Sequence, residues 1–141
     1  MKRIIITLCL VLLISFSFVS CGEEMDLLSG NTDISYKIEN GEAIVTKVPN
    51  KTAGRNIEIP DDYDGVPVTK IADFAAVNLE YAVKVTIGKN VREISDWSFG
   101  NSRKITAFEI DDENPYICDV DGVIYTKDMK SLLFYPPARN I

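Results

Sequence analysis

The chain has 141 residues, a formal net charge of −6 and no histidine. The lack of histidine excludes Ser-His-Asp and Cys-His catalysis and the usual histidine-bearing zinc sites. The acidic charge repels nucleic acid, so we expect no nucleic-acid partner.

The first 20 residues predict an export signal. Lys2 and Arg3 precede a mostly apolar run over residues 4–14, and a short apolar run after positive charges is typical of secretion signals. The run is too short to predict a membrane span. The next residues, FVSC ending at Cys21, resemble the lipobox of bacterial lipoproteins, in which the cysteine is acylated and becomes the new N-terminus.

This resemblance implies a lipoprotein that is held at a membrane by acyl chains on Cys21. Cleavage after residue 20 removes two cations and no acid, which leaves 13 cations, 21 acids and a net charge of −8. Residues 21–33 are mostly small and polar and predict a flexible tether. Glu23-Glu24 resembles acidic surface-export signals, which implies the outer membrane or the cell surface. The alternative is ordinary signal cleavage that leaves Cys21 as a free thiol.

Alternating residues predict that the folded domain, residues 34–141, begins with a β-hairpin. Apolar and polar side chains alternate before and after Asn40-Gly41 over residues 34–48, and Asn-Gly favours the tight turn of a hairpin. A second antiparallel meander is predicted near the C-terminus, with a turn at Asp121-Gly122. Its expected strands cover residues 117–120, 123–126 and 131–135.

An internal repeat of 23 residues lies between these hairpins. The segment from residue 71, IADFAAVNLEYAVKVTIGKNVRE, aligns without gaps with the segment from residue 94, ISDWSFGNSRKITAFEIDDENPY. A third, partial copy contains Ile57 and Ile59. A period in the twenties with one short strand per unit predicts a mainly β fold, a short leucine-rich-repeat solenoid flanked by β-hairpins. Because two full repeats are few for such a stack, we expect the hairpin at 34–48 and the C-terminal meander to cap its ends. If the chain is a truncated member of a longer array, a raw edge of the solenoid would be available to a partner.

The repeats resemble the BspA-type leucine-rich-repeat family of bacterial surface proteins. Its pattern, I-G-x-x-A-F-x-x-C-x-x-L-x-x-V-x-I-P, is matched at Ile94, Ser98, Phe99, Ser102, Ile105, Phe108 and Ile110. The chain departs from it at Ala76 and Leu79, where the family has Phe and Cys. The resemblance implies a noncatalytic interaction protein that adheres to host matrix or to other cells, so the expected partner is a protein or a matrix ligand.

Outward positions on the short strands are the candidate ligand-binding residues, because inward and outward side chains alternate along a strand. Glu58, Thr86 and Glu109 are expected at the strand centres. Lys84, Lys89 and Asp111 are expected to flank them. The alternative functions are a structural subunit of an envelope complex and a metal-dependent glycan-active enzyme.

Three acidic clusters are interpreted mainly as turns and solvated faces, with a weak calcium site as the alternative for each. They are 61–64, 111–113 and 119–121. We expect no metal site, no cofactor and no catalytic residue. Cys118, the cysteine left besides Cys9 and Cys21, is expected to be an inert packed thiol. Phe74 and Trp97 share one repeat position and are expected to pack partly into the core, the alternative being a platform for sugars or proteins.

Overall fold

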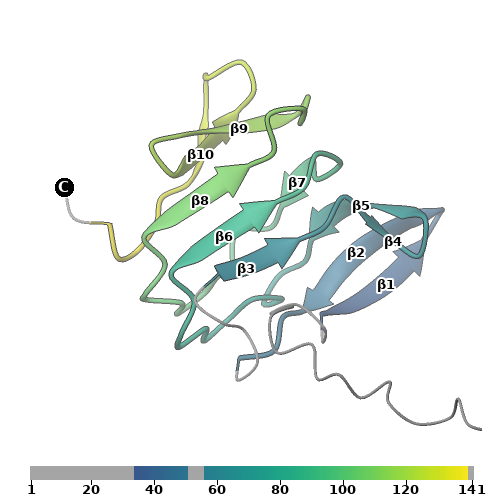
Figure 1. The fold of residues 1–141 in the computed structure, drawn as a ribbon, viewed down its shortest axis with the longest axis horizontal. Helices are drawn as coiled ribbons and strands as arrows, with labels where there is room; N and C mark the ends of the chain where they lie inside the picture. The colour runs from purple at the N-terminus through teal and green to yellow at the C-terminus, as the bar shows by residue number, and fades with distance from the viewer. Residues whose placement is uncertain (1–33, 51–55, 140–141) are drawn as a thin grey trace, which may run out of the picture.

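The computed structural model describes residues 34–50 and 56–139, which form eleven strands and, within those ranges, no helix (Figure 1). The predicted signal (1–20) and tether (21–33), including Cys21, lie outside them. The strands are β1 (Ser35–Glu39), β2 (Glu42–Lys47), β3 (Asn56–Ile59), β4 (Asp62–Tyr63), β5 (Val66–Ile71), β6 (Lys84–Ile87), β7 (Glu93–Ile94), β8 (Ala107–Ile110), β9 (Ile117–Val120), β10 (Val123–Thr126) and β11 (Leu132–Phe134). The described part of the chain contains no helix that is long and apolar enough to cross a bilayer. The protein is therefore mainly β, as predicted.

The predicted hairpin turns are confirmed. Asn40 and Gly41 join the antiparallel strands β1 and β2 with positive φ angles of 52° and 77°. Asp64-Gly65 joins β4 to β5, and Asp121-Gly122 joins β9 to β10, again with both φ angles positive. A two-residue turn of this kind needs left-handed backbone at both positions, which Asn-Gly and Asp-Gly adopt most readily.

Strands β3, β6 and β8 lie side by side in a parallel sheet (Figure 1). Ile57 pairs with Val85, which pairs with Phe108, so β6 and β8 are offset by 23 residues. Ile71 of β5 pairs with Ile94 of β7 at the same offset, in the sheet that also contains β1, β2 and β4. The 23-residue alignment of the sequence therefore corresponds to residues that are neighbours in space.

The core consists of inward side chains of these two sheets and of the third, antiparallel sheet formed by β9, β10 and β11. Exposed and buried residues alternate along β3, so that Ile57 and Ile59 are buried whereas Asn56 and Glu58 are exposed. Val85 and Ile87 of β6 and Phe108 of β8 are buried in the same way. With Val45 and Ile71 of the other sheet they belong to one apolar cluster.

Buried polar side chains form hydrogen bonds between neighbouring turns. The Ser98 hydroxyl lies 3.1 Å from the Ile71 carbonyl oxygen and 3.0 Å from that of Ala72. The Ser102 hydroxyl donates to the Ala76 carbonyl and accepts from the Leu79 N–H, at 2.8 and 3.1 Å. Turn backbone that lies out of reach of water needs such partners, because an unpaired buried polar group is destabilising.

Phe74 and Trp97 correct one expectation, because neither packs into the core. Their side chains are 63% and 64% exposed. Their backbones stack instead, since the Phe74 N–H donates to the Trp97 carbonyl oxygen at 3.3 Å. Phe74 has a φ of 60°, a left-handed conformation that is rare for a bulky residue. Ala76 and Leu79 face the interior instead, and both are almost fully buried. The family pattern has a Phe where this chain has Ala76, and the exposed ring of Phe74 does not take the place of that Phe.

The C-terminal meander closes the outer edge of β8. The Phe108 N–H donates to the Gly122 carbonyl, and the Ile110 N–H donates to Asp119 Oδ1, at 3.0 and 2.8 Å. A Cβ atom at position 122 would lie 2.8 Å from that of Ala107, so glycine allows this close approach. Phe134 of β11 belongs to the meander, and its ring forms an aromatic cluster with the rings of Phe99 and Phe108. The ring centroids in this cluster are 5.1 to 6.1 Å apart.

Truncation of Phe99 to alanine should lower the free energy of unfolding by roughly 3 to 5 kcal/mol, because Phe99 is only 5% exposed. Ile110→Ala should cost about 2 to 5 kcal/mol for the same reason. Chemical denaturation measures both changes. Phe74→Ala is the matched control, because it removes the same ring from a largely exposed position and should change stability little. Equal losses at Phe99 and Phe74 would contradict the assignment of the core.

Candidate functional site

The candidate site is the outer face of β3, β6 and β8, called here the strand face, formed by Glu58, Lys84, Thr86 and Glu109. Glu58 pairs with Thr86 and Thr86 with Glu109, so the three side chains form one row across the sheet. Each lies between inward residues that are buried. The structure thus brings together the three predicted strand-centre residues.

Hydrogen bonds and an ion pair order the row at Glu109. The Lys84 ammonium forms an ion pair with the Glu109 carboxylate, and the Thr86 hydroxyl lies 3.4 Å from Glu109 Oε2. The pKa of Glu109 lies below its ordinary value, mainly because its carboxylate accepts a hydrogen bond from Lys84. Partial desolvation raises this pKa, whereas the positive charge of Lys84 and the hydrogen bond from Thr86 lower it further. The strand face is therefore a fixed polar surface that can offer carboxylate acceptors and an ammonium donor to a partner.

Asp111 does not belong to this surface. It follows the end of β8, and its Oδ1 accepts the Glu113 N–H at 2.8 Å. Its carboxylate thereby serves the local turn, as aspartate commonly does. Lys89 lies past the end of β6 and forms ion pairs with Glu113 at 3.1 Å and Asp61 at 3.9 Å. The hydrogen bond to Glu113 is the main cause that raises the pKa of Lys89.

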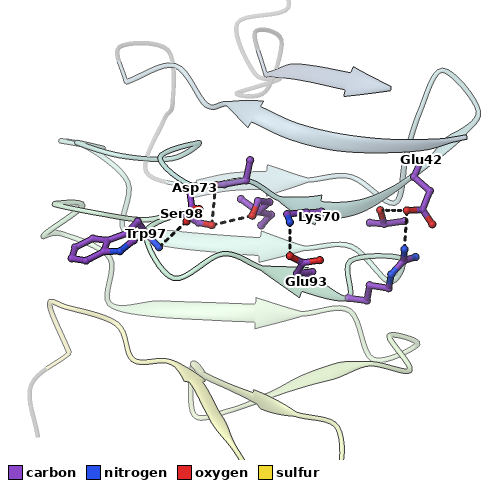
Figure 2. A network of polar contacts seen from close by, with 10 residues as sticks. Glu42, Lys70, Asp73, Glu93, Trp97 and Ser98 are labelled. Atoms are coloured by element: carbon purple, nitrogen blue, oxygen red, sulfur yellow. Dashed lines mark hydrogen bonds and ion pairs between the residues drawn. The ribbon is translucent and has the colours of Figure 1, made fainter. Parts of the chain in front are cut away.

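The structure reveals a second polar network, which the sequence patterns did not predict, on β2, β5, β7 and the residue before β7 (Figure 2). Arg92 Nη2 lies 2.7 Å from Glu42 Oε2, which also accepts from the Thr69 hydroxyl at 3.2 Å. Lys70 forms an ion pair with Glu93. The hydrogen bond between Arg92 and Glu42 is the main cause that lowers the pKa of Glu42 and raises that of Arg92. The 23-residue spacing of Lys70 and Glu93 could have suggested their contact, but Glu42 and Arg92 are 50 residues apart.

The acidic clusters supply partners for backbone N–H groups. Asp61 Oδ1 accepts the Lys89 N–H at 2.7 Å, and Asp119 accepts from Ile110. Across residues 34–50 and 56–139, no three His, Cys, Asp or Glu side chains are grouped as metal ligands would be. Cys118 is half-buried, and its Sγ lies 3.4 Å from Met129 Sδ.

Comparison with known proteins gives no match: neither a protein-family model, nor a curated protein, nor a solved structure is significantly similar to this chain.

The carboxyl group of Glu109 should titrate below the ordinary glutamate pKa, because Lys84 stabilises its charged form. Since the unfolded chain binds this proton more readily, the contribution to stability is present above the ordinary pKa and is lost as pH falls through the lowered value. Carboxyl-selective NMR titration measures the pKa directly. Lys84→Met should shift it up toward the ordinary value. An unchanged pKa in that variant would show that Lys84 is not the cause.

Proposed function

We propose that this chain is a small BspA-type leucine-rich-repeat protein. The support is the 23-residue offset at which β6 pairs with β8 and β5 with β7, together with the buried positions that match the family pattern. Ser98, Phe99, Ser102, Ile105, Phe108 and Ile110 are all at most 5% exposed. In this proposal the parallel strands are the strands of a short solenoid, and the hairpins at 34–48 and 117–135 cap its ends.

Within that fold, the protein acts as a noncatalytic interaction module at the cell envelope, and the strand face is its binding surface. The observation that carries this proposal is the in-register row of Glu58, Thr86 and Glu109, which presents polar groups on a rigid sheet. A partner is a protein or matrix ligand with basic groups opposite the carboxylates, because complementary charge guides specific association. Acyl chains on Cys21 hold the module at the membrane, and residues 21–33 separate it from the lipid.

Reversing two charges on the strand face should abolish partner binding without unfolding the protein. Glu58→Lys combined with Glu109→Lys replaces the two negative charges of the row by positive charges. The fold should persist, because exposed charges contribute little to stability. Binding is measured by pull-down from intact cells of the producing bacterium and, separately, on immobilised host-matrix proteins. A partner found only among envelope proteins would favour the structural-subunit alternative over adhesion.

Asp121→Asn is the matched control for this double variant. It removes one negative charge from an Asp-Gly turn, and Asn-Gly serves the same backbone geometry. It should leave both binding and stability unchanged. Loss of binding at Asp121 with no effect of the double reversal would move the site from the strand face to the turns.

Replacement of Cys21 by serine should release the protein from membranes, because serine cannot receive the thioether-linked lipid. Fractionation of cells that produce the wild type and the variant measures this. Proteinase treatment of intact cells then shows whether the anchored domain faces outward. A Cys21→Ser protein that stays in the membrane fraction and is processed like the wild type would contradict the anchor.

A further inference from the structure

A groove separate from the strand face lies between the turn that precedes β8 and the C-terminal segment. Its volume is about 470 Å³, which is within the usual range for small-molecule sites. The rings of Phe99, Phe108 and Phe134 contribute to its lining. The other residues that matter here are Asp96, Trp97, Asn101, Arg103 and Tyr135.

Trp97 gives this groove an exposed aromatic wall. Its main chain is fixed, because its N–H lies 3.4 Å from Asp73 Oδ1 and its carbonyl oxygen accepts from Phe74 and Gly100. Its indole remains 64% exposed and extends away from the strands (Figure 2). Tyr135 is 42% exposed on the same groove, and the Arg139 guanidinium lies 6.0 Å from the centroid of its ring. Large exposed aromatic side chains on a fixed main chain are typical of binding sites.

The groove also carries polar groups with unused hydrogen-bonding capacity. In the described part of the chain, the Asp96 carboxylate has no hydrogen-bond or ion-pair partner. Arg103 donates from Nε to Asn101 Oδ1 at 2.9 Å, and Asn101 in turn donates to Asn78 at 2.6 Å. This contact uses only the Nε donor of Arg103, so its terminal nitrogen atoms keep their donors for a ligand. Acceptor and donor groups thus border the same aromatic surface.

We propose that this groove binds a neutral glycan. A sugar ring offers an apolar C–H face, which suits the indole of Trp97, and hydroxyl groups at its rim that both donate and accept hydrogen bonds. Those hydroxyls pair with the Asp96 carboxylate and the Arg103 guanidinium. The acidic net charge of the chain disfavours acidic polysaccharides, so the proposed ligand is neutral. A proline-rich peptide also stacks on aromatic grooves, but its proline residues have no N–H to donate to the Asp96 carboxylate.

Trp97 is the single tryptophan of the chain, so its fluorescence reports on the groove alone. The full chain, in a detergent without a sugar headgroup, is titrated with xylo-, manno-, gluco- and galacto-oligosaccharides. Hyaluronan fragments and a proline-rich peptide are the comparison ligands. We expect at least one neutral oligosaccharide to change the emission saturably and to protect the indole from acrylamide quenching. Neither comparison ligand should do so.

The variants assign the binding to the groove. Trp97→Ala, measured by affinity electrophoresis in gels that contain the corresponding polysaccharide, should weaken binding at least tenfold, and Asp96→Asn several-fold. Phe74→Ala removes an equally exposed aromatic ring that does not line the groove, and should change affinity less than twofold. If Trp97→Ala fails to fold, Asp96→Asn and Arg103→Gln test the same rim without removing an aromatic ring.

Three outcomes would overturn the proposal: no saturable change with any neutral oligosaccharide, binding of the acidic fragments or the peptide instead, or equal losses for Phe74→Ala and the groove variants. The strand-face variant Glu58→Lys with Glu109→Lys should bind the oligosaccharide normally. Failure of the glycan site therefore does not affect the proposed function of the strand face, and the converse also holds.

Discussion

The structure depends on hydrogen bonds from buried side chains in one turn to backbone carbonyl groups of the preceding turn. Ser98 and Ser102 reach back to carbonyl groups 26 and 27 residues earlier, and Asn114 donates to the carbonyls of Gly88 and Val91 while it accepts from Tyr116 and Ile117. All these side chains are almost fully buried. If one turn were displaced along the chain relative to the preceding turn, several buried polar groups would lose their partners, at a cost of about 1 to 3 kcal/mol each. The register of the strands is therefore set as much by the turns as by the strands themselves.

A fixed register has a direct effect on the surface, because it decides which side chains become neighbours. Glu58, Thr86 and Glu109 form a row only because β3, β6 and β8 are paired in register. Lys70 and Glu93 meet on the other sheet for the same reason. Such pairs are solvent-exposed and add little stability. The groove beside Trp97 depends on the same stacking, since Asn101 is held by Asn78 of the preceding turn.

Much of this arrangement could be predicted from the sequence, because a gapless repeat encodes neighbours. The alignment of Ile71 with Ile94 and of Asn78 with Asn101 corresponds to a strand pair and a hydrogen bond. The alignment could not predict which way Phe74 and Trp97 point, since backbone angles in the turn decide whether an apolar side chain faces inward. Nor could it predict that Asp111 would serve its own turn, or that Glu42 would meet Arg92. The contact of Asp111 depends on the geometry of its own turn, and that of Glu42 with Arg92 depends on the strand order within one sheet, where β5 lies between β2 and β7.

The closure of β8 by Asp119 and Gly122 has a consequence for how copies of this protein behave at high local density. A parallel sheet that ends in free N–H and C=O groups is a template on which another chain can pair. Repeated head-to-tail addition at such an end produces an open filament, since nothing limits its growth. Here a carboxylate and a glycine carbonyl already accept the last N–H groups of the sheet. This edge of the sheet is thereby protected from strand-by-strand polymerisation, so copies at high local density do not join there.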